Sequence, residues 1–191
     1  MASEDHDTLV TVLKAAPEGS LAWLRGVLDV AWYELTAGAF KRGFAHVSPN
    51  VDAARVLLVA SPDCRETKQA VAEFLQLAGA EMYLRYCQGK AMAYYEEVLT
   101  IMPHHFEACI RLADCLTETG SISKAEEIFA QLTATYVDGD GDGGADVDIS
   151  AVFPSSQQAL DSLSAPRRRE LLKVWVLCHR ITLQKFRTEV V

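Results

Sequence analysis

Residues 79–98 read GAEMYLRYCQGKAMAYYEEV, and residues 113–132 read ADCLTETGSISKAEEIFAQL. The second stretch lies 34 positions after the first, and the two share small, aromatic and aliphatic residues at matching places. The matching pairs are Gly79 and Ala113, Ala91 and Ala125, Tyr95 and Phe129, and Val98 and Leu132. A fixed period of this length predicts a repeat of helical hairpins, because antiparallel helices approach closely only where small residues face each other. We therefore expect Gly79 to face Ala91, and Ala113 to face Ala125.

Proline and glycine divide the surrounding sequence into further helices. Ser20 is expected to cap a helix in which leucine recurs at intervals of three or four residues. Another helix is expected from Pro62 to about Cys87, ended by Gln88 and Gly89, with Gly89 in the turn of the first hairpin. Gly120 is the turn glycine expected in the second hairpin. No segment alternates as a strand does, so the sequence predicts an all-α chain.

The recurring positions resemble the tetratricopeptide repeat. That family places a small residue at its eighth position, alanine at its twentieth, an aromatic residue at its twenty-fourth and proline at its thirty-second, which Pro103 supplies in the first copy. Val137 stands at the proline position of the second copy. The resemblance covers residues 72–137, about two repeats, and implies antiparallel helical hairpins stacked as a tetratricopeptide-like solenoid. It also implies a non-enzymatic protein that binds a helical or extended segment of a protein partner, as an adaptor or a subunit of a larger assembly.

The rest of the chain is organised around these repeats. We expect a single helical domain over residues 1–191, with N-terminal helices in residues 3–60. Whether those helices form a degenerate earlier repeat is left open, because their period differs by about seven residues. Residues 138–154 are expected to form an acidic loop of Asp and Gly, and residues 155–191 to form C-terminal helices. The last helix begins at Pro166 and is expected to cap the stack.

In the tetratricopeptide architecture the first helix of each hairpin lines a groove that binds partners. The resemblance assigns to this groove Glu73, Gln76 and Tyr83 of the first hairpin, and Glu107, Ile110, Arg111 and Asp114 of the second. A peptide carboxylate would meet like charge there, because Arg111 is the only cation in the set, so a basic or amphipathic helix fits the groove better. The chain's own last helix is one candidate for it. The alternative is that these polar residues are simply solvated.

The last helix is apolar nearly all round, which is typical of a helix buried on more than one side. It also carries Arg167, Arg168 and Arg169 at its start, where the helix dipole favours acidic residues. Two interpretations remain open. The helix is either a cap whose arginines pair with the acidic remainder of the chain, or a docking helix, with these arginines and Trp175, in a larger assembly.

The acidic loop matches only part of a calcium-binding EF-hand. Asp138, Asp140 and Asp142 occupy its first, third and fifth positions, but Ile149 stands at the twelfth, where a bidentate Glu is needed. These aspartates are therefore weak calcium candidates, and we expect neither a metal site nor a cofactor.

Motifs for catalysis are missing from the sequence. It contains no phosphate-binding GxxxxGK[ST], no GxSxG and no HExxH. His105 and Cys109 share a helical face, but no second pair of ligands has the spacing of a zinc site. We expect the protein not to be an enzyme.

Charge and cysteine content indicate which partners and which cellular compartment to expect. The net charge of −8 disfavours nucleic-acid binding, although an RNA-binding protein of the pentatricopeptide kind is the alternative, because its period is similar. Residues 166–191 carry a balance of +5, which leaves −13 for the remainder. The five cysteines form no CxxC pair, the N-terminus lacks a signal peptide, and no apolar run reaches about 18 residues. We expect a cytoplasmic protein with reduced thiols and no membrane span.

Overall fold

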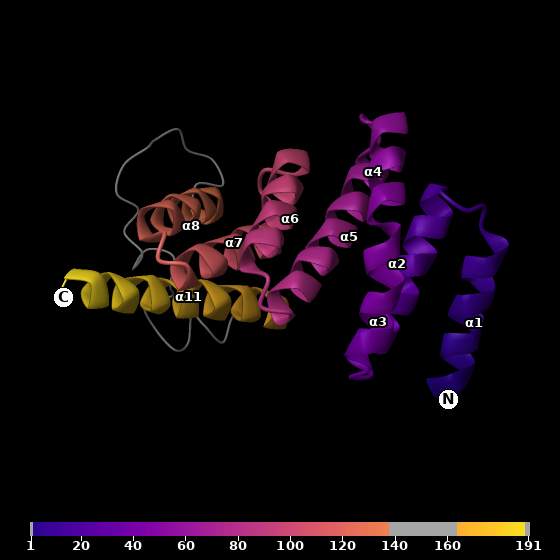
Figure 1. Ribbon diagram of the computed structural model, residues 1–191, viewed down its shortest axis with the longest axis horizontal. Coiled ribbons are helices and arrows are strands. Elements are labelled where there is room, and N and C mark those ends of the chain that lie inside the picture. The colour runs from indigo at the N-terminus through magenta and orange to yellow at the C-terminus, as the bar shows by residue number, and fades with distance from the viewer. Residues whose placement is uncertain (1, 138–163, 190–191) are drawn as a thin grey trace. The chain divides into compact units, whose positions relative to one another are not determined.

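In the computed structural model, residues 2–137 and 164–189 are described, apart from the side chains of residues 2–4, 133–137, 166–167 and 188–189. All regular structure in these two ranges is helical, as the sequence predicts (Figure 1). The elements are α1 (Ala2–Ala15), α2 (Leu21–Thr36), α3 (Phe40–Val47), the 3-10 helix η1 (Ser48–Asn50), α4 (Val51–Ala60), α5 (Arg65–Leu84), α6 (Gln88–Ile101), α7 (Phe106–Glu118), α8 (Ile122–Val137) and α11 (Ala165–Glu189). The predicted acidic loop at 138–154, with its calcium candidates, lies outside the described residues, as do residues 155–163 of the predicted C-terminal helices.

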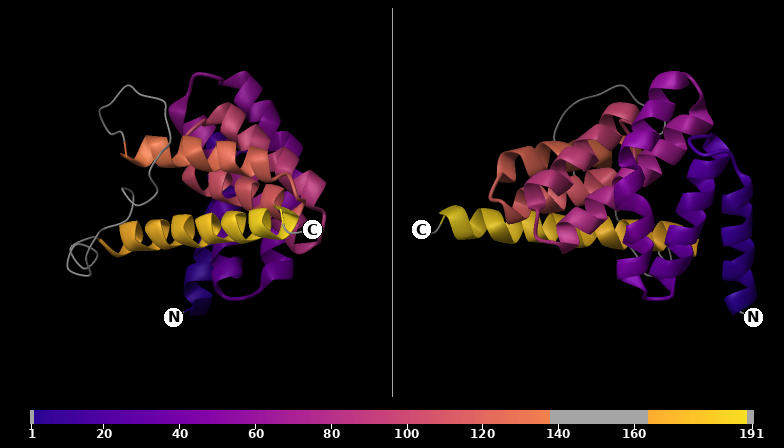
Figure 2. Two further views of the ribbon diagram at one scale, coloured as in Figure 1. Left: turned by 90° about the vertical axis from the view of Figure 1, so that its left-hand side faces the viewer. Right: turned by 45° about the vertical axis from the view of Figure 1, so that its right-hand side comes forward.

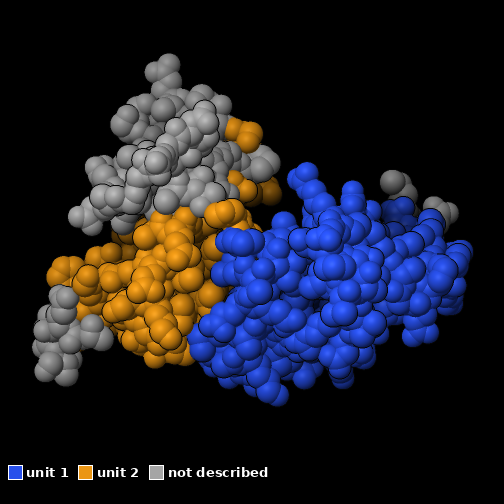
Figure 3. Space-filling model, turned by 90° about the horizontal axis from the view of Figure 1, so that it is seen from above, with its two compact units in different colours: residues 1–103 blue, residues 104–191 orange. Residues whose placement is uncertain are grey.

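The helices gather into two compact units, Met1–Pro103 and His104–Val191 (Figure 3). The boundary falls between the two predicted repeats, so that α5 and α6 belong to the first unit and α7 and α8 to the second. A single domain over residues 1–191 stays a prediction.

The first unit consists of helical hairpins packed side by side. The tightest pairs are α5 with α6 and α2 with α3, while α1 packs on α2, and α4 packs on α5 (Figure 2). Both α2 and α3 also contact α5, which joins the two hairpins. Ser20 caps α2 as predicted, since its Oγ accepts a hydrogen bond from the Trp23 backbone N–H at 3.1 Å. The side chains that fill the centre of this unit are Leu24, Val30, Val47, Val71, Phe74, Leu75, Tyr95 and Val98.

Small residues set the spacing of the α5/α6 hairpin. A Cβ added at Gly79 would lie 2.6 Å from Cε1 of Tyr95, which is fully buried. Ala91, the residue expected opposite Gly79, is also fully buried, one helical turn before Tyr95. The side chain in direct contact with Gly79 is therefore the aromatic ring of the repeat pattern. In the second unit, Ala113 and Ala125 are likewise fully buried.

One residue in each repeat turn has a left-handed backbone. In the turn between α7 and α8 it is Gly120, with a φ of +80°, as predicted. Between α5 and α6 it is Tyr86, with a φ of 58°, which stands 34 positions earlier. The prediction that Gly89 makes this turn is wrong, because α6 begins at Gln88 and Gly89 lies in its first helical turn. Helix α5 accordingly ends at residue 84 rather than near residue 87.

Matching backbone hydrogen bonds close both turns. The Cys87 N–H donates to the Met82 carbonyl at 2.9 Å, and the Ser121 N–H donates to the Leu116 carbonyl at 2.8 Å. Each bond spans five residues and satisfies a carbonyl at the end of the first helix, as in a Schellman motif. The two hairpins therefore share a period of 34 residues in backbone geometry as well as in sequence.

The second unit is the α7/α8 hairpin covered by α11. Helix α11 contacts both α7 and α8 (Figures 1 and 2), which is the position of the capping helix that the sequence predicts. Its buried side chains recur at intervals of three or four residues, and they are Leu171, Val174, Leu177 and Ile181. In the ranges that the structure describes, no helix combines the length and the apolar character needed to cross a membrane.

Candidate partner-binding surfaces

Helix α11 covers the face of α7 that the sequence assigns to the groove. Ile110, a predicted groove residue, is only 7% exposed because α11 lies over it. Contacts between cations of α11 and carboxylates of α7 and α8 accompany this apolar packing. They join Lys173 to Glu107, Arg180 to Asp114, Arg180 to Glu118 at 3.0 Å, and Lys185 to Glu126 at 2.9 Å.

These contacts neutralise the predicted groove residues of α7. Glu107 is shared by Lys173 and by Arg111, whose Nε lies 3.1 Å from its Oε1. Burial opposes the charge of Arg180, but hydrogen bonds to Glu118 and Asp114 raise the pKa of its guanidinium above the ordinary value. Arg180 is therefore a permanent cation in this contact.

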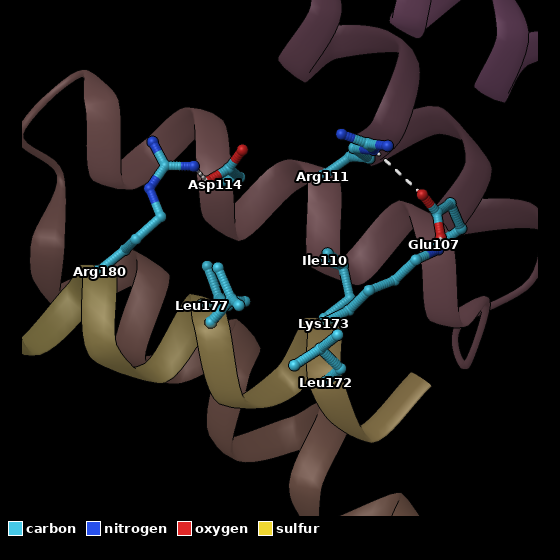
Figure 4. Close-up of a pocket in the computed structure, with 9 residues that line it drawn as sticks. Glu107, Ile110, Arg111, Asp114, Leu172, Lys173, Leu177 and Arg180 are labelled. Atoms are coloured by element: carbon cyan, nitrogen blue, oxygen red, sulfur yellow. Dashed lines mark hydrogen bonds and ion pairs between the residues drawn. The ribbon is translucent and has the colours of Figure 1, made fainter. Parts of the chain in front are cut away.

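A cavity of about 320 Å³ remains between α7 and α11 (Figure 4). Ile110, Leu172 and Leu177 supply apolar surface at its centre. Figure 4 shows charged residues at both ends, with Asp114 and Arg180 at one and Glu107, Arg111 and Lys173 at the other. Since these charges pair with one another, the space that they leave suits an apolar side chain.

The first unit has a groove of its own, of about 280 Å³, between α2 and α5. Its lining residues are Arg25, Leu28, Asp29 and Trp32 of α2, and Gln69, Ala70 and Glu73 of α5. Glu73 is one of the groove residues predicted from sequence, and its Oε1 accepts a hydrogen bond from Gln69 Nε2 at 3.1 Å. Trp32 is exposed and provides the largest apolar surface of the groove.

The groove residues predicted on α5 share one face of that helix. Glu73, Gln76 and Tyr83 are all half-buried, and they recur at intervals of three and seven residues. Only Glu73 lines the groove between α2 and α5.

Four groove residues on α2 were not predicted from the sequence, namely Arg25, Leu28, Asp29 and Trp32. The signal that locates them is Gly38, which has a φ of +78° and ends α2 as Gly120 ends α7. Counted back from these glycines, the four α2 residues of the first groove take the same positions as the four α7 residues of the second cavity. The corresponding pairs are Arg25 and Glu107, Leu28 and Ile110, Asp29 and Arg111, and Trp32 and Asp114.

The predicted docking residues of the last helix whose side chains are described are all exposed. Arg168, Arg169 and Trp175 are exposed, and the Trp175 ring lies 4.0 Å from the ring of His179 between centroids. The side chain of Arg167 lies outside the described residues.

His105 and the buried cysteines have structural roles. His105 caps α7, since its Nδ1 accepts a hydrogen bond from the Ala108 N–H at 3.3 Å. Cys109 and Cys115 are buried, and burial raises the pKa of both thiols, that of Cys115 to about 11. Among the residues described, no three His, Cys, Asp or Glu side chains gather as metal ligands would.

Comparison with protein families supports the resemblance seen in the sequence. Residues 89–142 match the family model of the tetratricopeptide repeat. The match begins in α6 and includes α7 and α8, so the tetratricopeptide resemblance is confirmed for that part of the chain. Repeats of this family generally mediate protein–protein interactions. No curated protein and no solved structure matches the chain.

Proposed function

We propose that this chain is a non-enzymatic protein-interaction module, an adaptor or a subunit of a larger assembly. Its groove between α2 and α5 binds a helical or extended segment of a partner. One observation carries the proposal: the first helices of the hairpins present the same four positions in both units, and in the first unit these positions line a groove with an exposed tryptophan. The free thiols of the five cysteines fit our placement of the protein in a reducing, intracellular compartment.

The groove residues favour a partner segment with basic and apolar side chains. Asp29 and Glu73 present two carboxylates against the single cation Arg25. The corresponding face of α7 shows what such carboxylates attract, because Glu107, the repeat equivalent of Glu73, binds Lys173 of α11. Trp32 supplies a flat apolar surface next to them, on which an aliphatic or cationic side chain packs.

A pair of designed peptides tests the proposal. Both are amphipathic helices of about three heptads with leucine at the apolar positions, and one carries lysine and the other glutamate on the flanking positions. We expect the full chain to bind the lysine peptide in fluorescence anisotropy, and Glu73→Lys to weaken that binding by about tenfold.

The matched control is Glu96→Lys, which makes the same charge change on an exposed residue of α6 outside the groove. It is expected to leave the affinity unchanged. Equal weakening by both substitutions would mean that the affinity depends on net charge alone, and it would overturn the proposal. Binding that depends on Glu107 instead of Glu73 would also overturn it, because the peptide would then be replacing α11.

A further inference from the structure

Helix α11 carries a second row of apolar side chains outside its buried row. Leu172, Trp175, Val176, Leu183 and Phe186 are between 44% and 62% exposed. The buried residues Leu171, Val174, Leu177 and Ile181 form a separate row that packs on α7 and α8. Exposed apolar residues are ordinary when scattered, but a continuous row of large ones marks an interaction surface.

The row has the spacing of a coiled-coil seam. Leu172, Val176, His179, Leu183 and Phe186 follow one another at intervals of four, three, four and three residues. This is the heptad spacing that places side chains along one line of a helix facing a second helix. We call these five residues, together with Trp175, the outer stripe of α11.

The outer stripe borders the cavity between α7 and α11. Leu172 and Val176 belong both to the stripe and to the lining of that cavity of about 320 Å³. A helix lying along the stripe has room to insert one apolar side chain beside Ile110 and Leu177 (Figure 4). Such insertion fixes the register of a docked helix and supplies a desolvated anchor.

The outer stripe takes the same positions on α11 as the predicted groove face takes on α5. Helix α11 packs on α7 and α8 as α5 packs on α2 and α3. When their buried residues are superposed in sequence, Val71, Phe74 and Ala78 of α5 match Val174, Leu177 and Ile181 of α11. Each groove residue then has a partner in the stripe, and the pairs are Glu73 and Val176, Gln76 and His179, and Tyr83 and Phe186. The positions that carry polar groove residues on α5 thus carry mostly apolar residues on α11.

The charges around the outer stripe select the occupant. Among the side chains that the structure describes, the exposed cations Arg169 and Arg187 border the stripe. A second copy of the chain would place these cations near one another, whether the two helices ran parallel or antiparallel, and like charges at a contact are costly.

We propose that the outer stripe of α11 binds an amphipathic helix of a partner protein, whose leucine-like residues pack on the stripe and whose flanking residues are acidic. This surface shares no residue with the groove between α2 and α5, so the two proposals stand or fall separately.

The glutamate peptide of the designed pair is the probe. We expect the full chain to bind it with a Kd of about 0.1 mM or tighter, and the double substitution of Leu183→Glu with Phe186→Glu to weaken binding by at least about tenfold. Both residues are exposed, so the variant is expected to fold, which circular dichroism and the thermal midpoint check. Arg187→Glu is expected to weaken binding less, and most at low salt.

The matched control replaces exposed apolar residues of α4, Val56→Glu with Val59→Glu, and is expected to leave the affinity unchanged. Failure of the glutamate peptide to bind, or equal binding by the double variant, overturns the proposal. A chain dimer in sedimentation equilibrium that the Leu183 and Phe186 substitutions dissolve also overturns it, since a second copy would then cover the stripe. Loss of lysine-peptide binding in the Glu73 variant has no bearing on this result.

Discussion

At the scale of single residues, Gly79 controls how closely α5 approaches α6. Gly79→Ala would place a methyl group 2.6 Å from Cε1 of Tyr95, and the buried ring has no room to move aside. We expect the free energy of unfolding to fall by about 2 kcal/mol, because overpacking a close-packed interior forces shifts of side chain or backbone. Urea unfolding followed by circular dichroism measures this loss.

Gly89→Ala is the matched control for this prediction. It makes the same change in α6, at a position where an added Cβ meets no described atom within 4 Å. Alanine is the better helix former, so the control is expected to be neutral or to stabilise by about 0.5 kcal/mol. Equal losses in the two variants would show that the close contact has no energetic weight.

The same two residues show what the sequence can and cannot give at this scale. The small residue at position 79 was predictable because its steric role recurs 34 positions later. The turn was not, because residue preference pointed to Gly89, whereas the chain uses Tyr86 in a left-handed conformation that costs a non-glycine residue about 1 kcal/mol. The hydrogen bond from the Cys87 N–H to the Met82 carbonyl, invisible in the residue types, holds it there.

Cys115 gives the second unit a dependence on alkaline pH. Burial first, and then the charges of Asp114 and Glu118, raise the pKa of its thiol from 9.0 to about 11. Between these two pH values the thiol stays protonated in the folded chain and is ionised in the unfolded chain. The contribution of the thiol to the free energy of unfolding is therefore complete below about pH 9 and is lost as the pH rises through about 11. Between about pH 8 and pH 11, we expect the free energy of unfolding of Cys115→Ala to fall by about 2 kcal/mol less than that of the natural chain. Urea unfolding at a series of pH values measures this difference. Parallel pH profiles would contradict this assignment.

At the scale of elements, α2 and α3 form a hairpin of the same construction as the two repeats. Gly38 has a left-handed φ of +78°, and the Ala39 N–H donates across the turn to the Glu34 carbonyl at 2.8 Å. Gly43 stands where Ala91 and Ala125 stand in the repeats, and a Cβ there would lie 2.7 Å from Leu35 Cγ. The α2/α3 hairpin therefore shares the turn geometry and the small residue of the two repeats, while its being a degenerate earlier repeat stays open. The sequence left it open because η1 and α4 follow this hairpin and stretch the spacing from Gly38 to Tyr86 to 48 residues.

Arg55 ties the inserted helix α4 to the repeat. Its Nε and Nη2 donate to the two carboxylate oxygens of Glu97 in α6, at 2.8 and 2.7 Å, and its guanidinium lies 5.7 Å from the centroid of the Tyr94 ring. Arg55→Lys keeps the charge but loses the two-point contact, so we expect it to lower the free energy of unfolding by about 1 kcal/mol. A double-mutant cycle with Glu97→Gln measures the coupling.

The comparison for Arg55 is its one-point contact with Asp52, at 3.0 Å on the exposed side of α4. A cycle with Asp52→Asn is expected to show coupling close to zero, because exposed single contacts add little to stability. Coupling of equal size in the two cycles would mean that charge alone, and not the paired geometry, connects α4 to α6.

At the scale of the whole chain, charge segregation indicated that the basic C-terminal segment would meet an acidic surface, but it left open whether that surface belongs to the chain itself or to a partner. The +5 of residues 166–191 against −13 elsewhere was visible in the sequence, and so was the need of the last helix for partners on more than one side. Which cations pair was not visible. The sequence singled out the three arginines at the start of α11, and it gave no sign that Lys173, Arg180 and Lys185 would contact carboxylates of α7 and α8.

Arg180 is the cation whose loss should loosen α11 most. It holds Asp114 and Glu118, which lie one turn apart on α7 and would repel each other without it. We expect Arg180→Ala to destabilise the docking of α11 by about 1 to 2 kcal/mol, seen as faster hydrogen exchange of the α11 amides, with a larger effect at low salt. Arg169→Ala removes an exposed cation of the same helix and is expected to leave that exchange unchanged. Equal acceleration in both variants, or an effect that salt does not alter, would mean that the four buried apolar residues hold α11 without help from its charges.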